Sequence, residues 1–398
     1  IKEYGGSTSF SGPIKDIEQL AKTLSYSVTE LLFLINTHES ERYSDPAKLA
    51  YKSDGSIRRI KNPSSNFRRI QGRINYRIIK TGIEWPPFLF GSIPKDSVNR
   101  ETDYIECARK HEGAKSICKI DITNFFDNIH ESYIYDMFMR LFRFPEPVSK
   151  ALTNICCYEE TLVQGARTSS YIATLILWEE EENIVEKLAK KNLVYTRLID
   201  DITISSKIAN YNFDVPKKHI ENMLLKLDLP VNPDKFKVQY TSMTPLEVHG
   251  LRVTYSSPTM AKSEMMNIKA AVHNLEMLAK TPNVRTEMWY RKDYNRCMGR
   301  VNKLSRIKSP RHKKFIQKLR KIRPLPSYKD LKYSKIRLTN LKSDFKNIKK
   351  KYSYSYYKRF YLLLNRTNLI KLTYPDKALK FRYELDKIKP LYNPKDYK

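Results

Sequence analysis

Apolar positions in the first part of the chain follow helical spacing and then change to strand-like runs. Residues 15–36 carry apolar side chains at helical spacing, with a polar break at Ser25 and Ser27, which predicts amphipathic helix. Residues 116–120 (SICKI) form a short apolar run that leads directly into Asp121, as is typical of a buried strand. The first 120 residues therefore combine helix with at least one buried strand.

Helical and strand-like periods alternate in the next part of the chain and then give way to helix alone. We expect a helix after Asn128 and another over roughly 168–192. Runs of aliphatic and β-branched residues predict a strand pair near 193–206 and a further pair near 236–255. Beyond about residue 257 the period is helical throughout. The pattern predicts an α+β part followed by an all-helical part.

Residues 51–71 predict a small basic hairpin. The Asp54-Gly55 dipeptide favours a tight turn between two short strands. The second of these strands carries Arg58 and Arg59. A pair of guanidinium groups close to a hairpin tip is suited to binding phosphate.

Composition narrows the class of protein. A chain of 398 residues with 41% hydrophobic residues is long enough for two or three packed subdomains and is not intrinsically disordered. The apolar runs are too short to span a bilayer, and we expect no membrane association, no signal peptide and a cytoplasmic location, although the chain starts at Ile1. The five cysteines lack CxxC spacing, so we expect reduced thiols.

The positive charge is concentrated near the C-terminus. The chain has a net charge of +30, yet residues 1–260 hold 35 Lys and Arg against 33 Asp and Glu, whereas residues 261–398 hold 38 against 10. Tyrosines are interspersed with lysines in residues 351–361 (KYSYSYYKRFY). Such a surface is suited to following phosphates and stacking on bases, although a solubilising or acidic-lipid-binding face remains the alternative.

Three aspartates provide the candidate chemistry. Asp121 ends a predicted buried strand, and Asp200 and Asp201 occupy the predicted tip of the hairpin in residues 193–206. If these strands are neighbours, the carboxylates can hold two divalent cations for phosphoryl transfer. Mg²⁺ is the expected ion, with Mn²⁺ as the alternative, because carboxylates are hard oxygen ligands. Alone, an Asp-Asp pair is more often a turn or a helix cap.

Five segments in order resemble the motifs of bacterial reverse transcriptases. The resemblance to motifs A, B and C lies in ICKIDITNFFDNI (117–129), LVQGARTSS (162–170) and RLIDDITIS (197–205), in that order. In this family, motif B typically reads LPQGAPTSP and motif C typically reads YADD. LPVNPDKFKV (229–238) and EVHGLRV (247–253) resemble motifs D and E. The resemblance covers roughly residues 15–300.

This resemblance implies a right-hand polymerase with fingers, a ferredoxin-like palm and a helical thumb, followed by a basic α-helical C-terminal extension. Residues 1–115 would form N-terminal helices and fingers, and 116–256 the palm, with the motif B helix on the fingers side. Residues 257–325 would form the thumb and 326–398 the Tyr-rich extension.

The resemblance also implies an RNA-directed DNA polymerase and assigns its metal ligands. Asp121, Asp200 and Asp201 match the catalytic, metal-binding aspartates, with the backbone carbonyl of Ile122 as a further ligand. Phe126 matches the residue whose ring occludes a ribose 2′-hydroxyl, so deoxynucleotides are the expected substrate. A core phenylalanine is the alternative for Phe126.

Further residues are expected to contact the nucleotide or the nucleic acid. The nucleotide contacts expected from the resemblance are Lys52, Arg58, Gln164, Gly165, Ile199 and Lys235, with Lys237 as an alternative to Lys235. The expected nucleic-acid contacts are Arg68, Arg69, Arg311, Lys313, Lys314 and Tyr356. A tyrosine hydroxyl within residues 352–357 as primer is a side hypothesis.

Several positions depart from the motif pattern. Leu198 and Ile199 replace Tyr-Ala in motif C, and Arg167 and Ser170 replace prolines in motif B. The boxes NAxxH and VTG of retron reverse transcriptases are recognisable but altered, as CARKH (107–111) and VHG (248–250). His111 and His249 are expected to be structural imidazoles, because the seven histidines lack metal-ligand spacing.

These departures favour a divergent relative, similar to the reverse transcriptases of bacterial antiphage defence. The alternatives are a retron reverse transcriptase that makes msDNA, a palm-fold RNA-binding scaffold for a partner polymerase, and an RNA-dependent RNA polymerase. The expected partners are a noncoding RNA, the DNA product and dNTPs. A second defence protein or polymerase and self-association stay open.

Overall fold

The chain divides into two compact units whose border lies between Pro258 and Thr259. The computed structural model describes residues 14–46, 49–52, 55–94 and 98–392, and Asp54 of the predicted turn lies outside these ranges. The predicted change from mixed to helical period near residue 257 falls beside this border. The first unit contains the mixed part of the chain, and the second contains most of the positive charge.

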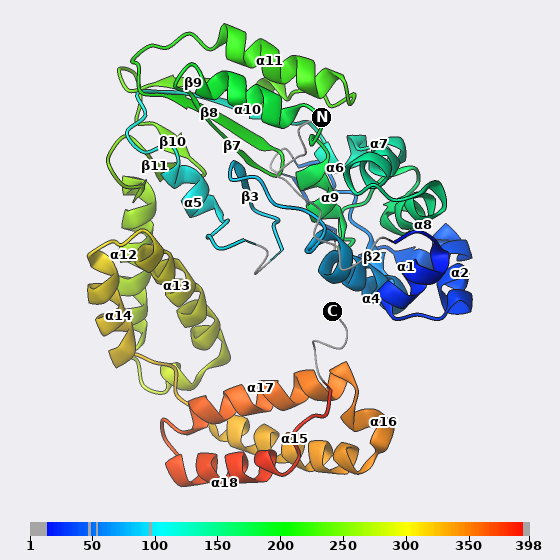
Figure 1. The fold of residues 1–398 in the computed structure, drawn as a ribbon. Helices are drawn as coiled ribbons and strands as arrows, with labels where there is room; N and C mark the ends of the chain where they lie inside the picture. Colours follow the sequence, from blue (N-terminus) through cyan, green and yellow to red (C-terminus); the bar gives the residue numbers. More distant parts are fainter. Residues whose placement is uncertain (1–13, 47–48, 53–54, 95–97, 393–398) are drawn as a thin grey trace. The chain divides into compact units, whose positions relative to one another are not determined.

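A five-stranded sheet organises the first unit (Figure 1). Its strand order is β3-β7-β8-β4-β9, with β3 parallel to β7 and the other neighbours antiparallel. The strands are β3 (Leu89–Phe90), β4 (Ser116–Asp121), β7 (Val194–Leu198), β8 (Asp201–Ser206) and β9 (Lys237–Tyr240). The buried strand over 116–120 and the strand pair near 193–206 are therefore confirmed.

Helices pack against the sheet because its strands are almost entirely buried. β4 and β8 are buried along nearly their whole length, as expected for strands covered on both faces. Helices α10 (Glu181–Ala189) and α11 (Asp214–Leu225) lie along one face of the sheet (Figure 1). The remaining short elements of this region are α5 (Tyr104–Arg109), α6 (Phe125–Asn128), α7 (Glu131–Asp136) and the π-helical turn Met137–Leu141.

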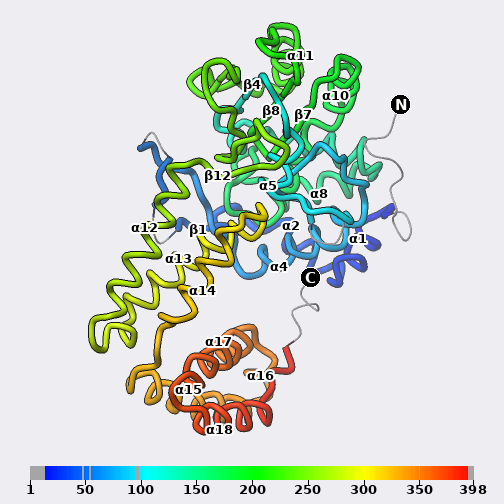
Figure 2. The backbone as a smooth tube through the Cα atoms, turned by 90° about the vertical axis from the view of Figure 1, so that its left-hand side faces the viewer, coloured from blue at the N-terminus to red at the C-terminus, as the bar shows by residue number. Residues whose placement is uncertain are grey.

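The N-terminal helices form a second layer of the same unit. The predicted polar break divides the first segment into α1 (Ile17–Leu24) and α2 (Val28–Asn36). Ser25 ends α1 in the left-handed region at φ 54°, and Ser27 forms a capping box with Glu30 at the start of α2. These helices pack with α4 and α8 (Figure 2). The bounds in this layer are α3 (Glu39–Arg42), α4 (Ser65–Ile74), the π-helical turn Asn75–Ile79, and α8 (Glu146–Cys156).

The helix predicted over 168–192 is interrupted, so that prediction was wrong in its middle. The structure has α9 (Ser169–Leu175) and then α10, which begins at Glu181. Buried Arg197 explains the break, because its guanidinium binds carbonyls at the end of α9. Nη2 donates to the Thr174 carbonyl at 2.6 Å and Nη1 to the Ala173 carbonyl at 3.4 Å. A continuing helix would use these carbonyls for residues 177 and 178.

The strand pair predicted near 236–255 is also different in the structure. β9 joins the central sheet, whereas β10 (Glu247–Val248) and β11 (Leu251–Arg252) form a separate hairpin, and β12 (Thr259–Met260) begins the second unit. The pattern identified extended segments but not their partners. The short strands of the N-terminal layer are β1 (Tyr43–Ser44), β2 (Asn62–Pro63), β5 (Cys157–Tyr158) and β6 (Thr161–Leu162).

The second unit is helical, as the period predicted. Buried tyrosines hold its second and third α-helices together: the Tyr290 hydroxyl donates to the Ile322 carbonyl and the Tyr294 hydroxyl to the Leu319 carbonyl. Arg291 forms a two-pronged ion pair with Asp330 (2.7 and 3.1 Å), which attaches the next helix. The helices are α12 (Lys262–Leu278), α13 (Met288–Arg306), α14 (Arg311–Lys321), α15 (Tyr328–Lys346), α16 (Ile348–Lys351), α17 (Tyr354–Ile370) and α18 (Pro375–Asp386).

Helices α15, α17 and α18 form a small bundle around their own core (Figure 2). Leu341, Tyr356, Leu363 and Leu385 belong to this core. Within the described ranges, no helix is both long and apolar enough to cross a membrane.

The ion pair between Arg197 and Glu181 is completely buried, with 0% exposure of both side chains. Removing one partner of such a pair leaves an uncompensated buried charge, so Glu181→Gln is expected to lower the free energy of unfolding by about 3–5 kcal/mol. Urea unfolding followed by circular dichroism measures this change. Glu146→Gln, at the exposed Glu146–Lys150 pair, is the control and should have little effect. Equal effects of the two substitutions would contradict the assigned role of the buried pair.

Candidate active site

The sheet brings the three aspartates together. β4 and β8 run antiparallel, and their register places Asp121 directly opposite Asp201. The amide of Ile122 donates to the carbonyl of Asp200 at 3.2 Å, which continues the pairing to the hairpin tip. Asp121 and Asp201, which are 80 positions apart in sequence, therefore lie on adjoining strands, as the sequence predicted.

Like charges at this strand end raise the cost of ionising Asp200. Burial, followed by the nearby Asp121 and Asp201 carboxylates, raises the pKa of Asp200. Lys235 relieves part of this repulsion, because its Nζ lies 2.9 Å from Asp121 Oδ2. The hydrogen bond to Asp121 in turn raises the pKa of Lys235. Of the two lysines considered for motif D, Lys235 is thus the one that reaches an aspartate.

The carboxylates of the three aspartates form a donor set that fits a divalent cation. In this structure, two of these carboxylates contact other side chains. Asp121 is bonded to Lys235, and Asp201 Oδ2 lies 3.3 Å from Nδ1 of His249. In the part of the chain that the structure describes, three or more His, Cys, Asp or Glu side chains do not converge in a geometry ready to hold a metal ion. Three adjacent carboxylates nevertheless supply hard oxygen ligands, and a cation would remove the repulsion around Asp200.

The turn that carries Asp200 has a strained backbone. Ile199 has φ 62°, which is a genuine outlier for a β-branched residue. The carbonyl of Ile199 accepts a hydrogen bond of 2.9 Å from Nη1 of the buried Arg197. Gly91 lies against the same turn, since a Cβ there would be 3.0 Å from Leu198 Cδ1. The hairpin tip is therefore fixed from two sides.

The loop after Asp121 connects the palm with the basic hairpin. Asn124 has φ 44° and precedes α6, and its side-chain oxygen accepts a hydrogen bond of 2.7 Å from Lys52 Nζ. Phe126 is half-buried, with its ring edge-on to that of Phe125. Tyr51 and Ile57 form an antiparallel bridge, in agreement with the predicted hairpin. This hydrogen bond therefore joins Lys52 to a residue that lies three positions after the end of β4.

Motif B is attached to the same hairpin through its backbone. Lys61 donates its amide to the Gln164 carbonyl at 2.8 Å, and Ile60 pairs with Gln164 in a parallel bridge. Gly165 has φ 112°, and a Cβ at this residue would lie 2.2 Å from the Lys61 carbonyl oxygen. Glycine is required here by a close approach of two protein segments, whereas the sequence suggested a close approach of nucleotide.

The other basic residues predicted at the site are exposed. Arg58 is exposed, and its amide donates to the Ala50 carbonyl. Its neighbour Arg59 forms an ion pair of 2.9 Å with Glu159. Arg68 and Arg69 are exposed on α4. Exposure leaves these side chains accessible to phosphate.

In the second unit, the structure corrects one predicted nucleic-acid contact. Arg311, Lys313 and Lys314 are exposed on α14. Tyr356 is fully buried, and its hydroxyl donates to the Ile388 carbonyl at 2.7 Å. The prediction that Tyr356 stacks on a base was therefore wrong, because its face of α17 packs into the bundle core. The rings of Tyr354 and Tyr361, on the same helix, are exposed by 59% and 42%.

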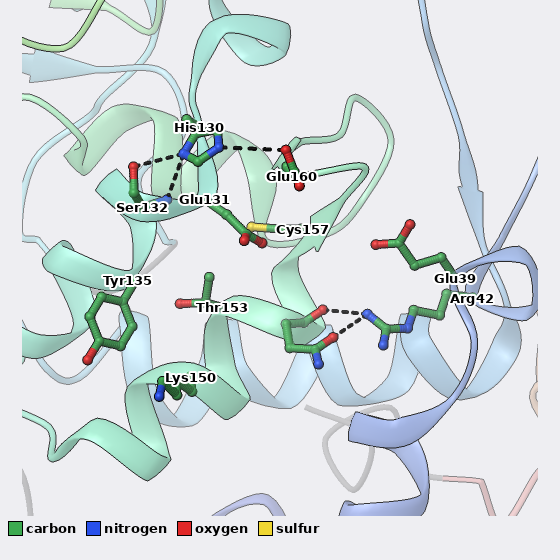
Figure 3. Close-up of a pocket in the computed structure, with 11 residues that line it drawn as sticks. Glu39, Arg42, His130, Glu131, Ser132, Tyr135, Lys150, Thr153, Cys157 and Glu160 are labelled. Atoms are coloured by element: carbon green, nitrogen blue, oxygen red, sulfur yellow. Dashed lines mark hydrogen bonds and ion pairs between the residues drawn. The ribbon is translucent and has the colours of Figure 1, made fainter.

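A separate hollow in the first unit does not include the aspartates. It has a volume of about 620 Å³ (Figure 3). Arg42 closes one side of it by donating to the carbonyl of Asn154 at 2.8 Å, and His130 caps α7 on another. Its lining residues are Glu39, Arg42, His130, Glu131, Ser132, Tyr135, Lys150, Thr153, Asn154, Cys157 and Glu160.

Two residues that support the aspartates were not identified from the sequence. Arg197 is the first residue of the motif C segment, three positions before Asp200, and Glu181 begins α10. A charged residue inside an otherwise apolar strand, as in VYTRLI, was the available signal. His249 was noted in the sequence, but its contact with Asp201 required the β10–β11 hairpin to be placed beside β8.

A sheet with carboxylates at the adjoining ends of β4 and β8 defines a palm-type nucleotide polymerase. The chain belongs to the reverse transcriptase family: a profile described as "Reverse transcriptase (RNA-dependent DNA polymerase)" matches residues 50–269. It is 42% identical to the Retron Ec48 reverse transcriptase of Escherichia coli, over 98% of this chain and 96% of that protein. It is 30% identical to the Retron Se72 reverse transcriptase of Salmonella heidelberg, over 83% and 85%.

These relatives identify the chain as a bacterial retron-type reverse transcriptase, an RNA-directed DNA polymerase with the right-hand fold. The retron alternative considered from the sequence is thus the one that the relatives favour. Among solved structures, the chain is similar to a telomerase from Candida albicans in complex with a fragment of telomeric RNA. The identity is 11% and the TM-score 0.37, with 95% of this chain and 73% of that chain covered. A TM-score and an identity this low are not evidence of a shared function.

Gly165→Ala is expected to lower both stability and activity. A non-glycine residue at φ 112° is strained by about 1–3 kcal/mol, before any movement needed to relieve the contact with the Lys61 carbonyl. Thermal unfolding and primer extension measure the two effects. Gly299→Ala is the matched control, since Gly299 is exposed within α13 and a Cβ there meets nothing within 4 Å. It should raise stability by up to about 1 kcal/mol. The same loss in both variants would contradict the assignment.

Proposed function

We propose that this reverse transcriptase copies a noncoding RNA into DNA by Mg²⁺-dependent transfer of deoxynucleotides. The observation that supports the proposal best is the register of β4 and β8, which puts Asp121 opposite Asp201 and next to Asp200. Asp121, Asp200, Asp201 and the backbone carbonyl of Ile122 would hold two Mg²⁺ ions, with Mn²⁺ as a substitute. When bound, these ions supply electrostatic stabilisation of the attacking and leaving oxygens.

The remaining roles belong to residues near the aspartates. Lys235 keeps its proton, because Asp121 raises its pKa, and we assign it to protonate the departing pyrophosphate. Lys52 lies at the loop after Asp121 through Asn124, and we assign it with Arg58 to the triphosphate. Gln164 and Ile199 would border the nucleotide.

A variant with Asp200→Asn and Asp201→Asn tests the polymerase assignment. Loss of both carboxylates is expected to reduce DNA synthesis by more than about a hundredfold, because several kcal/mol of transition-state stabilisation would be lost. Primer extension on RNA with dNTPs measures this, and sequencing of nucleic acid that copurifies with each protein identifies template and product. Asp228→Asn, at an exposed carboxylate bonded to Tyr133, is the control.

Three outcomes would contradict parts of the assignment. If the double variant keeps DNA synthesis, the aspartates are not catalytic. If it keeps biological protection as well, the scaffold reading is the better one. Extension with rNTPs rather than dNTPs by the wild type would favour an RNA polymerase.

Phe126→Ala tests the choice of sugar. The half-buried ring beside the loop of Asp121 is assigned to exclude a 2′-hydroxyl, so the smaller side chain is expected to raise rNTP incorporation relative to dNTP. The discrimination at stake is about 1–3 kcal/mol, or roughly 10–200-fold in the ratio of kcat/KM values. Phe125→Leu, in the core, is the control and should change stability rather than the ratio. An unchanged ratio in Phe126→Ala would assign Phe126 to the core.

We further propose that the second unit binds the RNA with an exposed group of tyrosines. Tyr357 lies at the centre of this group, with ring centroids 6.3 Å from Tyr354, 4.6 Å from Tyr361 and 5.3 Å from Tyr392. Lys358 and Arg359 are exposed on the same helix. Aromatic faces next to cations are suited to stacking with single-stranded bases and to contact with phosphates.

Tyr354→Ala together with Tyr361→Ala is expected to weaken RNA binding. Stacking contributes about 1–3 kcal/mol per base, so each ring lost should weaken binding by roughly 5–150-fold. Fluorescence anisotropy with labelled single-stranded RNA at fixed salt measures the effect. Tyr356→Phe is the control, because the buried ring keeps its packing and loses only the bond to Ile388. If the control weakens binding as much as the surface variant, the exposed tyrosines are not the contact.

The biological setting is part of the same proposal. The relatives named above are retron reverse transcriptases, and we propose that this chain works with its own noncoding RNA in antiphage defence. A second defence protein and self-association are compatible with this setting. All five cysteines are free and buried, which supports a cytoplasmic location. The sequencing experiment above identifies the RNA and the DNA product.

A further inference from the structure

Asp201 is attached to a row of buried polar side chains that extends away from the other aspartates. His249 Nδ1 lies 3.3 Å from Asp201 Oδ2, and His249 Nε2 lies 3.2 Å from Sγ of Cys107. The thiol in turn lies 3.3 Å from Oγ1 of Thr196, on β7. The His249 side chain is 8% exposed, and Cys107 and Thr196 are buried. One oxygen of Asp201 is thus held from inside the protein, while its side chain stays 37% exposed.

The far end of this row is fixed to the sheet. His111 Nε2 lies 2.7 Å from the Thr196 hydroxyl, and His111 Nδ1 lies 2.6 Å from the Ser205 hydroxyl on β8. Burial, with a smaller effect of His249, lowers the pKa of His111 to about 3, so this imidazole is neutral. Burial raises the pKa of Cys107 to about 12, so the thiol keeps its proton.

The contacts of His249 hold its ring between two groups. The Cys107 thiol donates to the Thr196 hydroxyl, and its sulfur lies against Nε2 of His249, while Nδ1 faces the Asp201 carboxylate. Cys107 thus fixes the ring orientation of His249. His249 fixes the orientation of Asp201. This is the arrangement by which outer partners orient metal-binding groups in proteins.

The backbone conformation of His249 is unfavourable for a histidine whose only role is to form the turn. His249 has φ 49° in the β10–β11 hairpin and is followed by Gly250 at φ 76°. The left-handed conformation costs a non-glycine residue about 1–2 kcal/mol, and Asn or Gly would fill such a turn at lower cost. The contacts of the imidazole with Cys107 and Asp201 offset this strain.

The two contacting residues also stand where two sequence boxes are altered. Cys107 is the first residue of CARKH, in place of the Asn of NAxxH, and His249 is the middle residue of VHG, in place of the Thr of VTG. They are 142 positions apart in the chain and meet between α5 and the β10–β11 hairpin, which lie side by side in Figure 1. The two residues that differ from the usual boxes, Cys107 and His249, therefore contact each other.

We propose that His249, held by Cys107, is a positioning residue that orients Asp201 for divalent-cation binding. The proposal rests on the proposed metal site at the three aspartates. It predicts a change in ion affinity of the folded protein, which a purely structural role of His249 would not cause. Cys107 acts only through His249 and has no separate effect on the ion.

Mn²⁺ binding to the full chain, without nucleotide or nucleic acid, tests the proposal through the electron paramagnetic resonance signal of the free ion. His249→Ala is expected to weaken binding by about 10–100-fold. His249→Asn should stay within about threefold of the wild type, since its amide can donate to Asp201 and Asn tolerates the left-handed backbone. Cys107→Ala should fall between them. The variant with both Cys107→Ala and His249→Ala should bind no more weakly than His249→Ala alone.

Two further measurements separate this proposal from its alternatives. Thermal unfolding in EDTA establishes that each variant is folded, and the Mg²⁺ concentration for half-maximal DNA synthesis should rise in His249→Ala, with kcat recovered at saturating Mg²⁺. Wild-type Mn²⁺ affinity in folded His249→Ala would overturn the positioning role. Asp121→Asn monitors the metal site itself: if it binds Mn²⁺ as the wild type does, the site of the proposed function is wrong, whereas loss there with retention in His249→Ala refutes only the positioning role.

Discussion

The buried guanidinium of Arg197 is the interaction on which the arrangement of the first unit depends. Its five donors are all used, by the two oxygens of Glu181 and by the carbonyls of Ala173, Thr174 and Ile199. These partners end α9, begin α10 and form the turn between β7 and β8. A rigid fork of donors suits this task, because a lysine could not bind a carboxylate and three carbonyls in fixed directions. Desolvation of the charge is costly, and the ion pair with complete hydrogen bonding makes it tolerable. The hydroxyl of Tyr195 adds a bond to Glu181, and burial raises the pKa of this tyrosine well above its usual range.

The same constraint explains how a strained and repulsive turn persists at the site. Ile199 is held in the left-handed region next to Asp200, whose pKa is raised by burial and by two neighbouring carboxylates. Strain of this kind persists only where the surroundings over-determine the conformation. Arg197 holds the turn through a carbonyl, Gly91, the residue after β3, lies against it, and His249 holds the adjoining Asp201.

In the second unit, helix α17 has one face in the bundle core and another face that is exposed. On α17, Tyr356 and Leu363 face the bundle core, whereas Tyr354 and Tyr361 are exposed beside lysine and arginine. The tyrosine-rich segment is therefore neither a core element nor a tail. Charge alone, with 38 basic residues against 10 acidic ones beyond residue 260, indicates a polyanion as partner.

The sequence by itself determined the elements, the order of motifs and the residue types at the site. The strands before Asp121 and around Asp200 could be predicted because buried strands have apolar runs, and the helical second unit because its period is continuous. Tertiary structure alone decided the break between α9 and α10, the partner of β9, the burial of Tyr356 and the contacts of Asp201. Each depends on groups distant in the chain: Arg197 takes carbonyls from α9, β4 accepts β9 at its edge, Ile388 accepts the Tyr356 hydroxyl, and Cys107 meets His249. Local periodicity reports which face of an element is apolar, but long-range hydrogen bonds select the partner that covers it.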